Sequence, residues 1–263
     1  MSAIFRPILV PLQHLGSLAW LAVETIRETL EHMMRGRAPF RAGILFYETD
    51  RVGVGSVPLV AMISFFMGLT MALLTGYQLQ KFGTQNLVPG LVGIGFTREL
   101  GPLMTGIMVA ARVGAAFTAE LGTMTASEEI EAIEAMGIGP LRFLVAPRVL
   151  AAFLLMPSLS VVANLAAMFG GAVVCEVKFG ISFRYFGELV LQNLIVRDIV
   201  SGVLKSLLFG AIIGLISCYK GLSVTGGSAG VGEATTSSVV TAITTVIGAD
   251  TLFNIVLVLL YET

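Results

Sequence analysis

The segment VGVGSVPLVAMISFFMGLTMALLTGYQL, from Val52 to Leu79, contains no charged side chain. A helix that crosses a bilayer needs about 20 consecutive, mostly apolar residues, so this segment is predicted to be a transmembrane helix. The composition of the whole chain supports this, because 56% of the residues are hydrophobic and 13% are charged, whereas soluble domains contain roughly 25% charged residues. A water-soluble fold is therefore excluded.

Four further apolar stretches have the length that a bilayer requires. They cover residues 101–121, 143–175, 199–218 and 238–260. Together with the first stretch they predict an all-α polytopic membrane protein, in which residues 52–263 form a transmembrane domain of about five spans. Small residues recur at every fourth position of the second stretch, which predicts that another helix backbone approaches it closely. These residues are Gly106, Ala110, Gly114, Thr118 and Gly122.

Residues 1–51 are predicted to form a separate N-terminal segment on the cytoplasmic side. Between residues 12 and 33, apolar side chains recur with helical spacing and acidic side chains fall between them. This pattern predicts a helix that lies along the membrane interface, and a soluble helix packed on a partner is the alternative. The first ten residues lack the features of a cleaved signal peptide, so we expect this segment to be retained.

The distribution of basic residues predicts how the chain is oriented. Cytoplasmic loops are enriched in Lys and Arg, and four arginines precede the first span whereas Lys81 alone follows it. These arginines are Arg35, Arg37, Arg41 and Arg51. The N-terminus is therefore predicted to be cytoplasmic, and five crossings place the C-terminus outside. Three basic residues on the predicted outer side run against this assignment: Lys178, Arg184 and Arg197.

The acidic segment TASEEIEAIEAMG, residues 125–137, interrupts two apolar spans. Thr125 and Glu128 have capping-box spacing and Gly137 is placed to end a helix, so a short cytoplasmic helix is predicted over residues 126–136. It would carry an apolar edge of Ile130, Ile133 and Met136 beside Glu128, Glu129, Glu131 and Glu134. Such an edge favours docking onto a cytoplasmic partner, and a plain loop helix is the alternative.

Charged residues inside a membrane are costly and therefore are candidates for function. In the predicted topology, Arg98 and Glu99 lie just outside the start of the second span, at the height of Lys205 in the fourth. A polar ring at this height, with Gln78, would suit an amphipathic ligand whose head lies near Arg98 and Lys205. Its tails would lie among Met71, Leu74, Leu79 and Phe82. The alternative is a structural salt bridge from Glu99 to Lys205 or Arg98.

No catalytic, cofactor or metal site of its own is indicated. GGSAG at residues 226–230 matches G-x-S-x-G, but the two histidines, His14 and His32, both lie near the N-terminus, and a nucleophile elbow needs a general base. A flexible glycine-rich loop is the preferred interpretation. The chain contains no Walker A motif, so ATP hydrolysis would need a partner subunit. The net charge of −1 gives no basic field for nucleic acid.

Three stretches together resemble the MlaE-type permeases, the membrane subunits of ABC systems that work with MCE-domain lipid-binding proteins. The stretches are FTRELGPLMTGIMVAARVGAAFTAELGTMTASEEIEAIEAMGI from Phe96, PRVLA from Pro147, and GGSAGVGEATTSSVV from Gly226 with Asp250 beyond it. The resemblance covers essentially the whole chain.

The resemblance implies a homodimeric permease in the bacterial inner membrane that moves phospholipid to or from a periplasmic MCE-domain protein. The helix over residues 126–136 would couple it to a cytoplasmic ABC ATPase, and a small cytoplasmic STAS-domain subunit is a further partner that the family allows. The resemblance also implies that Arg98, Glu99 and Lys205 belong to a lipid cavity.

A second function, an ion-coupled secondary transporter or channel, would use the charged residues Arg112, Glu120 and Asp250. Such proteins often contain internal repeats with broken helices at the midplane. No convincing repeat is present, and five spans do not divide into two equal halves. The permease interpretation is therefore favoured.

Overall fold

A computed structural model describes residue 27 and residues 42–261. The predicted interfacial helix over residues 12–33 lies outside this part of the chain, apart from Arg27. Residues 42–261 contain helices and no strand, and five helical segments are long and apolar enough to cross a membrane. The predicted all-α polytopic fold is confirmed.

The five segments cover Gly53–Gln80, Gln85–Ala126, Leu141–Phe179, Val196–Leu222 and Gly227–Leu259. The first lies within α2 (Ala42–Gln80). The second consists of η1 (Gln85–Leu87), α3 (Val88–Gly95), η2 (Phe96–Leu100), α4 (Gly101–Val109), η3 (Ala110–Gly114) and α5 (Ala115–Ala126). The others are formed by η4 (Leu141–Val145) with α7 (Ala146–Phe179), by α9 (Val196–Leu222) and by α10 (Gly227–Tyr261). Two short helices, α6 (Glu129–Ala135) and α8 (Phe183–Asn193), lie between spans.

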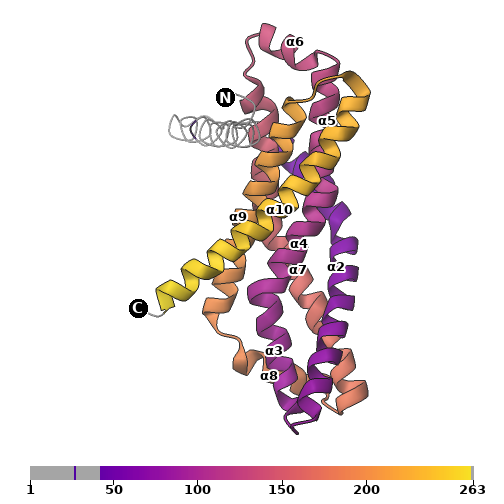
Figure 1. Cartoon of the computed structure of the whole chain (residues 1–263), viewed down its shortest axis with the longest axis vertical. Coiled ribbons are helices and arrows are strands. Elements are labelled where there is room, and N and C mark those ends of the chain that lie inside the picture. The colour runs from indigo at the N-terminus through magenta and orange to yellow at the C-terminus, as the bar shows by residue number, and fades with distance from the viewer. Residues whose placement is uncertain (1–26, 28–41, 262–263) are drawn as a thin grey trace, which may run out of the picture.

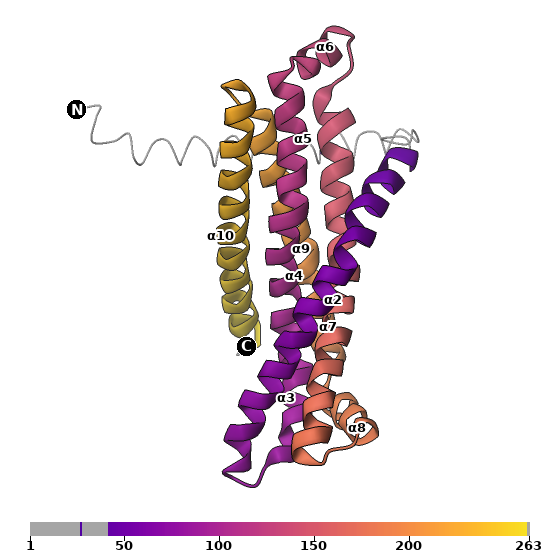
Figure 2. The same ribbon diagram turned by 90° about the vertical axis from the view of Figure 1, so that its right-hand side faces the viewer.

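The spans alternate in direction between two ends of an elongated bundle (Figures 1 and 2). We name these the α6 end and the α8 end after the short helix at each. The helices α2, α7 and α10 start at the α6 end, whereas the second span and α9 start at the α8 end. At its C-terminal half α10 diverges from the other helices (Figure 1).

Two predicted boundaries are wrong. The second span begins at Gln85 rather than at Gly101, so Arg98 and Glu99 lie inside it and not just outside its start. The fifth begins at Gly227 rather than at Ser238, so the predicted flexible loop at residues 226–230 instead forms the first turn of α10. In both regions polar residues and glycines lower the hydropathy, but packing against neighbouring helices keeps the backbone helical.

The small residues of the second span pack as predicted. A Cβ on Gly114 would lie 2.8 Å from Oγ of Ser217 in α9, and one on Gly122 would lie 2.9 Å from the side chain of Val224. The hydroxyl of Thr118 bonds to the Ser217 carbonyl at 3.0 Å and to the Ser238 hydroxyl at 2.8 Å. This row therefore lies against α9 and α10.

A close contact between spans joins α2 to α7, where the two backbones touch directly. A Cβ on Gly68 would lie 2.0 Å from the carbonyl oxygen of Ala167, and a Cβ on Gly170 would lie 2.2 Å from that of Phe65. Each glycine thus accepts the backbone of the other helix, and no side chain fits between them at these two points.

We expect Gly68→Ala to lower the free energy of unfolding by about 1–3 kcal/mol, because its methyl group would force the α2 and α7 backbones apart. The matched control is Gly248→Ala in α10, since a Cβ there meets no atom within 4 Å. Thermal unfolding in detergent, followed by size-exclusion chromatography, measures both. Equal midpoints for the two variants would contradict the close contact.

Candidate functional site

The ammonium group of Lys205 lies in a polar cluster between the second span, α9 and α10. Lys205 is 0% exposed. Its Nζ contacts Oε2 of Glu99, donates to Oδ1 of Asn254 at 2.7 Å and forms an ion pair with Oδ1 of Asp250 at 2.9 Å. Oδ1 of Asp250 receives no hydrogen bond, so its contact with the ammonium is an ion pair alone. We call these four residues the Lys205 cluster.

The local sequence explains how Glu99 reaches Lys205. Pro102 lacks an amide N–H and crowds the carbonyl of the residue four positions earlier, and the turn before it, η2, is π-helical. Such bulges are frequent at functional sites. Gly202 allows α9 to touch this bulge, because a Cβ there would lie 2.1 Å from the Thr97 carbonyl oxygen. Lys205 follows Gly202 by about one helical turn, which places it beside Glu99.

Two carboxylates face one ammonium in the Lys205 cluster. The ring of Phe253 lies 5.6 Å from Nζ of Lys205 and adds a cation–π contact. The hydroxyls of Thr97 in η2 and Ser201 in α9 are buried and lack a hydrogen-bond partner within the described chain. The cluster is therefore polar, and water or a ligand could satisfy these groups.

Arg98 and Glu99 are adjacent but have different surroundings. Glu99 forms the salt bridge to Lys205 that was the alternative to a ligand site. Arg98 is half-buried, and no hydrogen bond or ion pair joins it to another residue within 42–261. Among the charged residues predicted for the site, Arg98 thus remains available to a ligand.

The predicted tail-contacting residues divide into two groups. Met71 and Leu79 pack against a buried cluster that includes Phe96, next to the η2 bulge. The side chains of Leu74 and Gln78 are exposed and Phe82 is 78% exposed. The structure therefore brings Met71 near the charged residues but leaves these three side chains on the outer surface near the α8 end.

Sequence reasoning missed Asn254 and did not assign Asp250 to the Lys205 cluster. The two residues are four positions apart on α10 and so share one face. A buried carboxylate in an apolar span requires a positive partner. From this requirement the sequence could have paired Asp250 with Lys205, a lysine in another apolar span.

Helix α6 is confirmed, with bounds of Glu129–Ala135 inside the predicted 126–136. The predicted capping box is wrong, because Thr125 donates to the Leu121 carbonyl at 2.8 Å and does not cap the helix. Gly137 ends the helix with φ of +75°, as predicted. All four glutamates in the segment, Glu128, Glu129, Glu131 and Glu134, are exposed.

Part of the apolar edge of α6 packs against other helices of the same chain. Ile130 and Ile133 pack against a buried cluster that includes Leu121 and Leu144. Met136 is 68% exposed. The surface that α6 leaves open consists of the glutamates and Met136, and the two isoleucines attach the helix to the bundle.

The three residues of the ion-coupled alternative have separate neighbours. Glu120 pairs with Arg148 at 3.3 Å, and Asp250 pairs with Lys205 at 2.9 Å. Arg112 is exposed, and its guanidinium lies 2.9 Å from where a Cβ on Gly55 would stand. Arg112 forms no ion pair or hydrogen bond with another residue within 42–261. The structure therefore does not assemble an ion site from these three residues.

The hydrolase alternative gains no support from the geometry. Ser228 is exposed in the first turn of α10, and residues 42–261 contain no histidine. No group of three metal-ligating side chains is found within the same residues. Cys175 and Cys218 are both buried and form no disulfide bond with each other.

Comparison with known proteins identifies relatives across most of the chain. The family model for Permease MlaE matches residues 45–256. A probable ABC transporter permease protein of Rickettsia typhi is 34% identical over 204 residues, which cover 78% of this chain and 79% of the relative. A probable ABC transporter permease protein of Synechocystis is 33% identical over 212 residues, covering 81% and 80%.

A plant protein is similar over the same region. The protein TRIGALACTOSYLDIACYLGLYCEROL 1, chloroplastic, of Arabidopsis thaliana is 36% identical over 203 residues, covering 77% of this chain and 58% of the relative. The family model matches far more than half of the chain, and the two bacterial relatives are named as probable permease proteins of ABC transporters. The chain therefore belongs to the MlaE permease family and is an ABC transporter permease.

Proposed function

We propose that this permease moves phospholipid, using ATP hydrolysed by a separate ATPase subunit. The observation that carries the proposal is the Lys205 cluster, which places charged groups inside apolar spans beside the unpaired cation of Arg98. Intramembrane charges mark substrate pathways. A phosphate group near Arg98, with acyl chains along the apolar surface at Met71, would match an amphipathic lipid.

A relative supports the lipid class. The Arabidopsis protein bears the name of a glycerolipid, trigalactosyldiacylglycerol. A lipid has an anionic or polar head and apolar tails, and the site combines a free guanidinium with apolar neighbours. An ion substrate would not need the apolar part.

The proposed assembly is a homodimer in the bacterial inner membrane, with the α6 end cytoplasmic and the α8 end facing a periplasmic MCE-domain protein. In its apolar 18-residue stretch the fifth span is only 17% buried within the described chain, compared with 50% for the corresponding stretch of the fourth. A second copy would cover part of this exposed surface. The ATPase would bind the open face of α6, and a STAS-domain subunit would bind on the same side. The N-terminal residues 1–51 would lie at the cytoplasmic interface.

Arg98→Gln is expected to lower the phospholipid bound to the purified protein about tenfold, because one charge-assisted hydrogen bond to phosphate would be lost. Native mass spectrometry of protein released from lipid nanodiscs measures the occupancy. Arg98→Lys keeps the charge and is the matched control, expected to retain most of the lipid. Unchanged occupancy in Arg98→Gln would remove Arg98 from the site.

Reconstitution with the ATPase subunit and the MCE-domain protein tests the proposed function as a whole. Lipid should move between vesicles and the MCE-domain protein only when ATP is present, and the chain alone should not hydrolyse ATP. Transport that continues with an ion gradient and without ATP would overturn the proposal in favour of ion coupling.

A further inference from the structure

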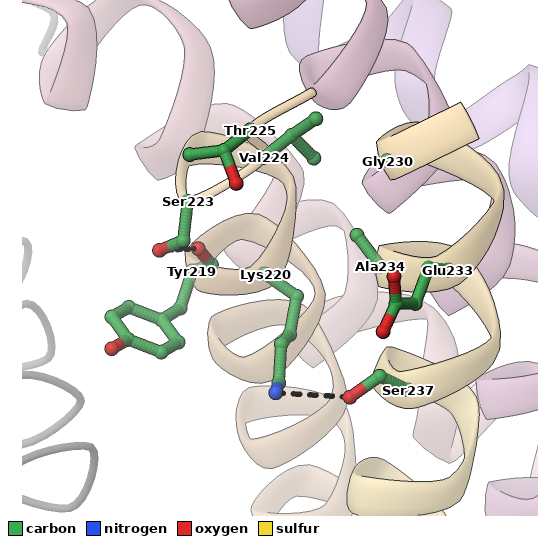
Figure 3. A pocket seen from close by; sticks show the side chains of 9 residues that line it. All are labelled: Tyr219, Lys220, Ser223, Val224, Thr225, Gly230, Glu233, Ala234 and Ser237. Atoms are coloured by element: carbon green, nitrogen blue, oxygen red, sulfur yellow. Dashed lines mark hydrogen bonds between the residues drawn. The ribbon is translucent and has the colours of Figure 1, made fainter. Parts of the chain in front are cut away.

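A second polar pocket lies between α9 and α10 at the α6 end, far from the Lys205 cluster. It has a volume of about 250 Å³ and opens to the surface (Figure 3). Its lining includes Lys220, Glu233, Ser237, Tyr219 and two hydroxyl residues of the connection between the helices, Ser223 and Thr225. We call this cavity the α9–α10 pocket.

The charges of the α9–α10 pocket are not neutralised by each other or by neighbours. Lys220 donates to the Ser237 hydroxyl at 3.0 Å, and Glu233 lies one turn before Ser237 on α10. Figure 3 shows both charged groups directed into the space between the helices. Neither Lys220 nor Glu233 forms an ion pair with another residue within 42–261. One cation and one anion therefore remain available side by side.

The walls of the pocket are held in place by close backbone contacts. The connection packs on the first turn of α10, because a Cβ on Gly230 would lie 1.9 Å from the Thr225 carbonyl oxygen. The Ser223 hydroxyl donates to the Tyr219 carbonyl at 2.7 Å. The side chain of Tyr219 belongs to the apolar cluster on which α6 packs. The pocket is thus preformed and lies next to the apolar cluster on which α6 packs.

The position of the pocket fits the head-group layer of one leaflet. Lys220 is two residues from the end of the fourth span at Leu222, whereas Lys205 lies 15 residues earlier (220 − 205) on the same helix. At 1.5 Å per residue the two lysines are about 22 Å apart along α9, which is most of the hydrocarbon thickness of about 30 Å. The two sites therefore lie near opposite leaflets.

We propose that the α9–α10 pocket binds the zwitterionic head group of a phospholipid in the leaflet at the α6 end. The phosphate would accept from Lys220 and from the hydroxyls of Thr225 and Ser237, and the ammonium of an ethanolamine head would pair with Glu233. A pocket for a simple anion would not place a carboxylate beside the lysine. The inference rests on the proposed lipid transport and adds a second head-group site, with a preference for zwitterionic lipid.

Site-specific crosslinking tests the occupant. A photoreactive residue replaces the exposed Thr225 in the full chain, reconstituted with its ATPase in nanodiscs that contain equal amounts of phosphatidylethanolamine and phosphatidylglycerol. Thr236, exposed on α10 and outside the pocket lining, carries the same group as a control. We expect crosslinks to phosphatidylethanolamine at position 225 and only background at position 236.

Two variants separate the roles of the charges. Lys220→Gln should lower the crosslinking of both lipids about tenfold, because both carry a phosphate. Glu233→Gln should lower only the phosphatidylethanolamine crosslink, about tenfold, since phosphatidylglycerol has no ammonium group. Glu188→Gln on the exposed surface of α8 is the matched control. Retention on size-exclusion chromatography checks that each variant is folded, and Lys220→Arg, which keeps the charge, should restore the lipid crosslink.

Three results would overturn the proposal. Equal crosslinking of both lipids in the parent and in Glu233→Gln would remove the zwitterion preference, and displacement of the lipid by excess inorganic phosphate would assign the pocket to free phosphate. A crosslink to the ATPase in place of lipid would make it a protein contact. If lipid transport and the Arg98 effect persist in any of these cases, the proposed function stands without this pocket.

Discussion

Lys205→Met is expected to lower the free energy of unfolding by about 3–5 kcal/mol, because it leaves two carboxylates without their buried counter-charge. Glu99 and Asp250 both contact the ammonium, which is 0% exposed. Methionine has a similar length and flexibility, so the lost charge and not a lost volume causes the effect. Thermal unfolding of the purified protein in detergent measures it.

The matched control removes all three charges at once. The variant that combines Lys205→Met with Glu99→Gln and Asp250→Asn contains no unpaired buried charge and should recover most of the lost stability. Such a recovery identifies the penalty as electrostatic. If Lys205→Met unfolds at the parent's temperature, the ammonium is hydrated in the folded protein and the buried cluster is wrong. Because of this penalty, Arg98 reports on lipid binding more cleanly than Lys205 does.

Reversal of two glutamates, Glu128→Lys and Glu131→Lys, is expected to weaken binding of the ATPase subunit at least a hundredfold, since like charges across an interface cost several kcal/mol. This expectation rests on the proposed role of α6. Both side chains are exposed, and Ile130 and Ile133 keep α6 attached to the bundle. The fold should therefore be unaffected. Copurification of the ATPase and ATP-driven lipid transport measure the loss.

Glu188→Lys is the control for this reversal, because Glu188 is exposed on α8 at the opposite end of the bundle. It should leave ATPase binding unchanged. Normal assembly and transport in the reversed protein would show that the ATPase does not use the acidic face of α6.

Sequence patterns predicted the spans well because hydropathy is a property of single segments. The charge-free stretch from Val52 to Leu79 lies within α2, and the small residues from Gly106 to Gly122 lie against neighbouring helices. Hydropathy failed at Gln85–Leu100, where polar side chains and glycines lie inside a helix. Tertiary packing decides the backbone there.

The sequence shows which residues in the spans are charged, but not which of them form ion pairs in the fold. Arg98, Glu99 and Lys205 stand out in the sequence, but the π-helical turn at η2 changes which side each residue faces. A residue inserted into a helix rotates the following side chains by about 100°. A pattern based on 3.6 residues per turn could therefore offer the Glu99–Lys205 salt bridge only as one alternative, and could not decide in its favour.

The contact between α2 and α7 has a mechanical consequence. Shear motion requires helices to slide over an interlayer of side chains that can change rotamer, and Gly68 and Gly170 leave no such layer between the backbones. Two interlocked points also prevent rotation of one helix about the other. We therefore expect the segments of α2 and α7 around Gly68 and Gly170 to move together as one body during a transport cycle.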